Sequence, residues 1–192
     1  MNIAAQPPVQ ADQTIYLKDY QKPSFLVESI HLDIQVYDDH TLVDSTMVMK
    51  RQATGALVFL GRDLELKSIQ LNGQVLGAAQ YQLDSEQLVI IDAPDEVIVQ
   101  TQVIIHPESN TQLEGLYKAG DLFVTQNEPE GFRKITFYPD RPDVLSVFTT
   151  RVEADKKYPV LLANGNLLET GEVGEDRHFA IWQDPTKKPS YL

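Results

Sequence analysis

The densest group of polar side chains in this sequence lies at residues 125–133, between two strand-like runs. Glu128 and Glu130 are two residues apart in this segment, and glycosidases use such paired carboxyl groups to flank and cleave a glycosidic bond. The chain has 28 acidic residues, so pairs of this kind also arise by chance. The sequence therefore leaves two interpretations of the segment, a carboxylate dyad for acid and base chemistry or a solvated acidic turn.

Pro129 affects the backbone conformation of the same segment. A peptide bond before proline adopts the cis form far more easily than any other peptide bond. A cis bond reverses the chain and fixes the direction of the side chain that precedes it. We therefore predict that the Glu128–Pro129 bond is cis and that this turn directs the Glu128 side chain.

Other residues that commonly carry chemistry are sparse. The chain has no Cys, which excludes disulfides, thiolate nucleophiles and Cys-ligated metals. No P-loop, dinucleotide fingerprint or G-x-S-x-G motif is present. The histidines lack the H-x-x-x-H or H-x-H spacing of a metal site, so we expect no metal site or cofactor in this chain. We expect the four histidines to have structural or solvent-facing roles: His31, His40, His106 and His178.

The elements that must position residues 125–133 are predicted to be strands. From Ser29 onward, apolar and polar side chains alternate with a period of two, which describes a half-buried strand. The chain then turns at residues 38–40. Further strand-like runs lie at residues 42–51, 56–60, 64–71, 87–92, 97–105, 122–125, 134–138, 146–154, 158–162 and 178–183.

Turn and helix signals complete the fold prediction. Asn72-Gly73 and Asn164-Gly165 predict two tight hairpins, because Asn and Gly tolerate a positive φ at both central positions. The one helix signal lies at residues 140–146, where Asp140 can cap the first turn and Pro142 can occupy it. Many short strands with one short helix predict an all-β domain of stacked or curved antiparallel sheets.

The length, composition and net charge of the chain limit the kinds of protein and partner that we expect. A chain of 192 residues with 42% hydrophobic residues can bury a substantial core. The net charge of -12 opposes ligands that bind through phosphate groups, so we expect neither nucleic acid nor membrane as a partner. The first ten residues lack the basic and apolar parts of a signal peptide, and no run of eighteen apolar residues occurs. We therefore expect a cytoplasmic location.

The domain organisation is simple. Residues 1–14 are rich in Ala, Gln and Pro and are expected to form a flexible lead-in. Residues 15–192 are expected to form one domain without an internal repeat. The chain stops at Leu192 on apolar residues with no closing turn, so we interpret it as truncated.

Around residues 125–133 the sequence resembles the amino-terminal domain of the bacterial aminopeptidase N family. The members of this family are gluzincin zinc metallopeptidases. Order and spacing agree over residues 15–192. The matching segments are NTQLEGLY at 110–117, TQNEPEGFRKIT at 125–136, DRPDVL at 140–145, FTT at 148–150, LANGN at 162–166 and WQDP at 182–185.

The resemblance implies a saddle-shaped antiparallel β-sheet domain, truncated before the catalytic domain of the same polypeptide. The parent would be a cytoplasmic zinc aminopeptidase that removes amino-terminal residues from peptides. Gln126 and Glu128 match the pair that this domain lends to the active-site rim. Glu128 would contact the free α-amino group of the peptide substrate, and Gln126 would help to orient it.

The zinc-binding motif H-E-x-x-H and the motif G-A-M-E-N of this family are absent from the chain. We therefore expect the isolated chain to bind no catalytic zinc and to hydrolyse no peptide, with zinc held by the parent enzyme. A free-standing β-sandwich module that binds carbohydrate or protein is the alternative function, and a small hydrolase that uses Glu128 and Glu130 is another.

Overall fold

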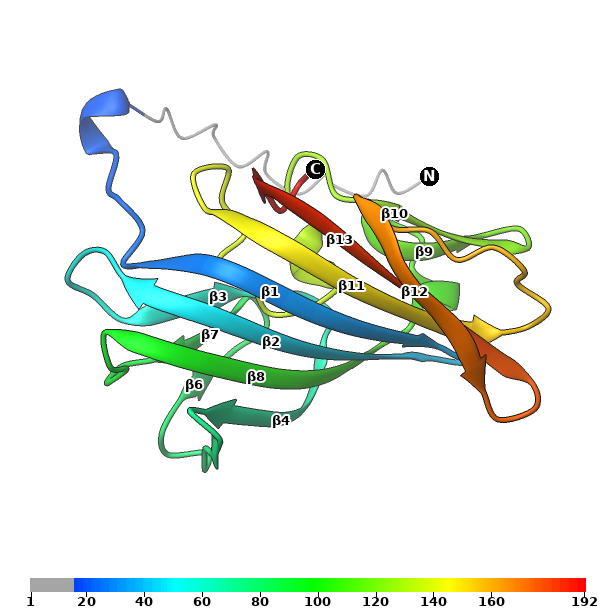
Figure 1. Cartoon of the computed structure of the whole chain (residues 1–192). Coiled ribbons are helices and arrows are strands. Elements are labelled where there is room, and N and C mark those ends of the chain that lie inside the picture. Colours follow the sequence, from blue (N-terminus) through cyan, green and yellow to red (C-terminus); the bar gives the residue numbers. More distant parts are fainter. Residues whose placement is uncertain (1–15) are drawn as a thin grey trace, which may run out of the picture.

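The structure, a computed structural model, describes residues 16–192, and the predicted lead-in at residues 1–14 lies outside the described residues. Strands form almost all of the regular structure (Figure 1), so the all-β prediction is confirmed. The elements are η1 (Leu17–Asp19), β1 (Phe25–Val36), β2 (Thr41–Arg51), β3 (Leu57–Leu60), β4 (Glu65–Leu71), β5 (Gln74–Val75), β6 (Gln82–Leu83), β7 (Gln87–Ile90), β8 (Glu96–Ile105), η2 (Pro107–Ser109), β9 (Gly115–Ala119), β10 (Leu122–Gln126), η3 (Phe132–Lys134), β11 (Leu145–Asp155), β12 (Asn166–Val173) and β13 (Arg177–Pro189), where η marks a short 3₁₀ turn.

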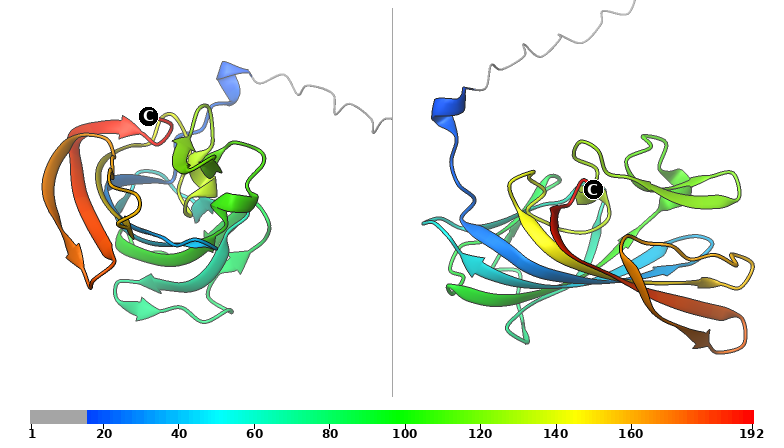
Figure 2. Two further views of the ribbon diagram at one scale, coloured as in Figure 1. Left: turned by 90° about the vertical axis from the view of Figure 1, so that its right-hand side faces the viewer. Right: turned by 45° about the horizontal axis from the view of Figure 1, so that its top comes forward.

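The largest sheet has eight strands in the order β12-β13-β11-β1-β2-β8-β4-β5. Its long strands twist and curve, as the expected saddle requires, and β12 at one edge crosses the direction of β8 (Figures 1 and 2). One pair departs from the predicted antiparallel arrangement, because β1 runs antiparallel to β2 and parallel to β11. Parallel neighbours need a long connection, and residues 37–144 provide it.

The hydrophobic core lies on one face of the central strands. Alternate side chains of β1, β2 and β8 point to this face, and Leu32, Val43 and Val99 are among those buried. The small sheet β3-β7-β6 covers part of this face and contributes the fully buried Phe59 and Leu88. The pattern specifies the register, since a slip of one residue would turn the apolar set of a strand toward solvent.

The short helix predicted at residues 140–146 does not form. The segment makes a turn in which the Val144 N–H donates to the Arg141 carbonyl over 3.2 Å, and β11 begins at Leu145. Asp140 was expected to cap this helix, but its carboxylate accepts hydrogen bonds from Arg133 and Ser190 instead. The Asp140 carboxylate is therefore not available to accept the hydrogen bonds that would cap the first turn of a helix.

Two predicted strands are also wrong. Residues 134–138 contain the end of η3 and a single bridge between Leu60 and Tyr138, because the first amides of this segment are used in local turn hydrogen bonds to the Gly131 and Phe132 carbonyls. Residues 158–162 are irregular. They contact β13 through Trp182, whose Nε1 donates to the Leu161 carbonyl over 3.1 Å. The other predicted strands are present.

The two predicted hairpins have different outcomes. Asn72-Gly73 connects β4 to β5 with φ angles of 51° and 79°, as predicted. Asn164-Gly165 is not a hairpin, because the residues directly before it are irregular rather than a strand. Asn164 Nδ2 instead donates to the Leu192 carbonyl. Glycine is needed at Gly165 for another reason, since a Cβ there would lie 2.2 Å from the Gln183 carbonyl oxygen.

Candidate functional site

The segment with Gln126 and Glu128 is a tight turn between β10 and η3, at the open end of the β9–β10 hairpin. The Gly131 N–H donates to the Asn127 carbonyl over 2.8 Å and closes the turn. A Cβ at Gly131 would lie 2.4 Å from the Gln126 carbonyl oxygen, so only glycine fits here. The Glu128–Pro129 bond is cis, which confirms the prediction.

The two carboxylates of this turn have different surroundings. Glu128 is exposed, and its carboxylate makes no ion pair or hydrogen bond with any side chain of residues 16–192. Glu130 forms an ion pair with Arg133 over 3.2 Å. Gln126 Nε2 donates to the Glu128 backbone carbonyl over 3.1 Å, so the predicted pair of Gln126 and Glu128 lies together on one turn. The carboxylate that stays open to a ligand is therefore Glu128.

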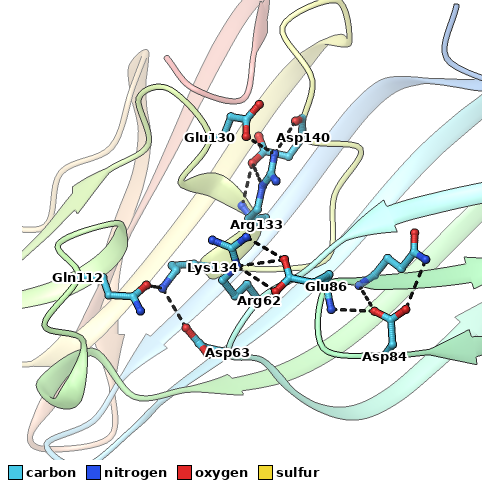
Figure 3. A network of polar contacts seen from close by, with 10 residues as sticks. Arg62, Asp63, Asp84, Glu86, Gln112, Glu130, Arg133, Lys134 and Asp140 are labelled. Atoms are coloured by element: carbon cyan, nitrogen blue, oxygen red, sulfur yellow. Dashed lines mark hydrogen bonds and ion pairs between the residues drawn. The ribbon is translucent and has the colours of Figure 1, made fainter. Parts of the chain in front are cut away.

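A buried ion pair holds the end of the turn (Figure 3). Arg133 Nε lies 3.0 Å from Asp140 Oδ2, and the Asp140 side chain is only 2% exposed. The Arg133 N–H also donates to Asp140 Oδ2 over 3.2 Å, and Ser190 Oγ donates to Asp140 Oδ1. Sequence reasoning missed this role of Arg133 and Asp140, although both lie in segments that carry the family resemblance.

A second buried cation, Lys134, ties the same region to two loops (Figure 3). Its Nζ donates to Asp63 Oδ2 over 2.9 Å and to Gln112 Oε1, and its side chain is 4% exposed. The Arg62 N–H donates to the Arg133 carbonyl over 3.0 Å, and the Arg62 side chain pairs with Glu86. The backbone that follows the turn is thus fixed from several directions.

Aromatic packing in the interior supports the turn. The Phe132 ring packs edge-on against the rings of Tyr138 and Phe148, with centroids 5.0 Å and 5.8 Å away. Burial raises the pKa of Tyr138, whose hydroxyl is hydrogen-bonded to Ser146. This hydroxyl therefore stays protonated at neutral pH and has a structural role.

An apolar groove of about 740 Å³ lies beside the turn. Its floor is made of β1 and β11 side chains such as Leu32 and Val152, and Asn127 and Leu192 lie on its lining. Val160 and Leu162, which also line the groove, are 67% and 71% exposed. Neither Glu128 nor Glu130 lines this groove, so the structure does not place the two carboxylates in it as a dyad.

The residues present do not fit a zinc site. Within residues 16–192, no group of three His, Cys, Asp or Glu side chains is arranged to hold a metal ion. His106 contacts Glu65 over 3.0 Å, His40 contacts Asp39, and His178 Nε2 contacts the Tyr158 carbonyl. The same range contains no helix that is long and apolar enough to cross a membrane.

Comparisons with known proteins point to one family. A family model described as the Peptidase M1 N-terminal domain matches residues 19–192. Aminopeptidase N of Caulobacter vibrioides is 45% identical over 184 residues, which are 94% of this chain and 21% of that protein. Aminopeptidase N of Escherichia coli is 41% identical over 186 residues, which are 95% of this chain and 21% of that protein. The chain thus spans about a fifth of the length of these relatives.

Solved structures agree with this assignment. The crystal structure of Legionella pneumophila aminopeptidase A in complex with aspartic acid matches with a TM-score of 0.86 and 30% identity, over 91% of this chain and 21% of that one. An M1 zinc metallopeptidase from Deinococcus radiodurans matches with a TM-score of 0.75 over 88% of this chain and 41% of that one. At 17% identity, the second match supports the fold alone.

Proposed function

This chain belongs to the Peptidase M1 N-terminal domain family, as its resemblance to aminopeptidase N predicted, and from this membership we propose that it is the amino-terminal domain of a zinc aminopeptidase. The whole protein would remove amino-terminal residues from peptides. The relatives that support this proposal are about five times as long as the chain. The cytoplasmic location of the protein stays a prediction.

The proposed role of this domain is to recognise the free α-amino group of the substrate through Glu128. An exopeptidase must distinguish a terminal ammonium from an internal peptide nitrogen, and a carboxylate forms a hydrogen-bonded ion pair only with the ammonium. The observation that carries the proposal is the exposed Glu128 carboxylate, which has no partner within residues 16–192 although the turn around it is firmly held.

Gln126 is proposed to orient the substrate next to Glu128. Its side chain is exposed, and its Nε2 already donates to the Glu128 carbonyl over 3.1 Å. The side-chain oxygen has no protein donor among the described residues and is free to accept from the ligand. Gln126 would therefore both shape the turn and contact the substrate.

The proposed partner of the domain is the catalytic domain of the same polypeptide, which would hold the zinc ion. The apolar groove beside the turn supports this partner, because Val160 and Leu162 add exposed apolar side chains to a lining that is already apolar. The last residues of β13 and Leu192 border this groove, so the chain that follows them in the longer relatives would start next to it.

The test is the variant Glu128→Ala in the full-length protein. A hydrogen bond to a charged group is worth about 1.5–3 kcal/mol, so kcat/KM for an alanyl or leucyl chromogenic amide should fall roughly ten- to two-hundred-fold. A change below twofold would remove the proposed role of Glu128. The isolated chain should not cleave the same amide, and measurable zinc-dependent cleavage by the pure chain would contradict the proposed division of labour.

A further inference from the structure

Asp140 is a buried carboxylate that the proposed α-amino recognition does not use. Each of its oxygens accepts from a different part of the chain. Oδ2 accepts from the backbone N–H and the Nε of Arg133, over 3.2 Å and 3.0 Å, while Oδ1 accepts from Ser190 Oγ. Asp140 therefore joins the residue that follows the Glu128 turn to the chain just beyond β13.

Arg133 carries this connection into the turn itself. Its Nη2 lies 3.2 Å from Glu130 Oε2 and donates to the Asp140 backbone carbonyl over 3.2 Å (Figure 3). One guanidinium thus contacts the turn on one side and the buried carboxylate on the other. The opposite end of the turn is held by the pairing of Gln126 with Gly115 in the β9–β10 hairpin.

From these contacts we propose that Asp140 is a positioning residue for Glu128. It fixes Arg133, and through Arg133 it sets the place of the turn relative to Ser190 and the chain that follows. The inference rests on the proposed function, because it takes Glu128 as the group that receives the substrate ammonium. A buried charge must be satisfied by its donors, so it holds them more firmly than an exposed carboxylate would.

The position of Glu128 matters because a displacement of about 1 Å at a reacting or binding group can cost on the order of a hundredfold in rate. A loosened turn would leave Glu128 exposed and charged but poorly placed. The loss would then fall on ligands that carry an α-amino group and spare ligands that lack it. A general loss of stability would affect both kinds of ligand equally.

The experiment uses the full-length protein and two competitive inhibitors, leucine hydroxamate and its des-amino analogue 4-methylpentanohydroxamate. The two compounds differ only in the α-amino group, so the ratio of their inhibition constants measures recognition of that group. We expect Asp140→Asn to reduce the preference for the amine about tenfold and to change inhibition by the des-amino analogue less than twofold. In the Glu128→Gln background, Asp140→Asn should change the ratio less than twofold, because both residues act on one interaction.

Asp143→Asn is the matched control. Asp143 lies three residues further along and pairs with Arg141 over 2.7 Å and with Tyr20 over 2.9 Å, away from the turn. This variant should leave the ratio of inhibition constants unchanged.

The outcomes separate the two proposals. A ratio that Glu128→Gln does not change overturns the proposed function itself. A ratio that Glu128→Gln lowers and Asp140→Asn leaves unchanged overturns only the role of Asp140. If Asp140→Asn does not fold, Ser190→Ala decides, since it removes one donor from Asp140 and should lower the ratio about twofold to threefold. An unchanged ratio in Ser190→Ala overturns the inference.

Discussion

Glu153 on β11 offers a sharp test of how the sheet is stabilised, because its carboxylate joins two arginines on the face opposite the groove. Its side chain is 8% exposed, with Oε1 2.7 Å from Arg177 Nε and Oε2 2.6 Å from Arg151 Nη2. Arg151 also pairs with Asp33 on β1 over 2.7 Å. The cluster thus crosses β1, β11 and β13 and balances two positive charges with two negative ones.

The substitution Glu153→Gln removes one negative charge and keeps the size of the side chain. A hydrogen bond to a charged group contributes about 1.5–3 kcal/mol, and glutamine offers its one oxygen to only one arginine. The other arginine then faces the amide NH2 group and keeps only its second partner, which is Asp33 for Arg151 and the Val36 carbonyl for Arg177. We expect the free energy of unfolding at pH 7 to fall by about 2–4 kcal/mol, which lowers Tm on the order of 5–15 °C for a domain of this size.

The stabilisation by Glu153 depends on pH, and its direction follows from the pKa of this carboxyl group. Burial alone would raise the pKa of Glu153, but hydrogen bonds from Arg177 and Arg151 outweigh burial and lower the pKa below its usual value. The unfolded chain therefore binds this proton more readily than the folded chain, and the stabilisation is present above about pH 4.5. It is lost as the pH falls through the lower pKa of the folded state.

Urea denaturation of the chain and of Glu153→Gln, followed by circular dichroism at pH 7, 5 and 3, measures this difference. The difference should be full at pH 7 and 5 and should shrink at pH 3. The control is Glu172→Gln, whose carboxylate is 66% exposed and pairs with Lys156, and which should leave stability unchanged. A difference of less than about 0.5 kcal/mol at pH 7, or one that is the same at pH 3, would refute the reasoning.

Two further predictions concern the turn and a surface histidine. Gly131→Ala places a Cβ 2.4 Å from the Gln126 carbonyl oxygen and should destabilise the chain by about 1–3 kcal/mol in urea denaturation. Gly77→Ala is the control and should be milder, because φ is not positive there and the nearest atom, Gln80 Oε1, would lie 3.7 Å from the new Cβ. Equal effects of the two substitutions would contradict the steric argument. The side-chain hydrogen bond to Glu65 raises the pKa of His106, so its stabilisation is full below about pH 6.5 and is lost as the pH rises through the higher folded pKa. His106→Gln should flatten the stability profile between about pH 6 and 8, and an unchanged slope in thermal melts would count against this pair.

Local sequence patterns predicted most of the strands, and their failures have a common cause. The alternation from Ser29 and the Asn72-Gly73 turn depend on neighbouring residues, and both predictions hold. The helix at residues 140–146 fails because Asp140 bonds to Ser190, fifty residues away. Asn164-Gly165 fails because its partners, Leu192 and Gln183, come from the far end of the chain.

The sequence pointed to exposed residues of the candidate turn and gave no indication of the buried residues that support it. The residues that carry the family resemblance pointed to Gln126 and Glu128, and the structure places both on one exposed turn. The sequence did not indicate that Lys134 is buried, since a lysine side chain usually extends its charged end to solvent. Its burial depends on Asp63 and Gln112, whose proximity only the folded chain establishes.

The parallel pairing of β1 with β11 sets an order on the appearance of the structure during translation. β1 and β2 leave the ribosome together and can pair at once, whereas residues 145–155 follow only after the whole of 37–144 has been made. At about 5–20 residues per second, the nascent chain exposes the free edge of β1 for roughly 5–20 s. The other edge of β2 is paired sooner, by β8 at Glu96–Ile105, so the free edge of β1 gives a newborn polypeptide the longer time in which to pair with another chain.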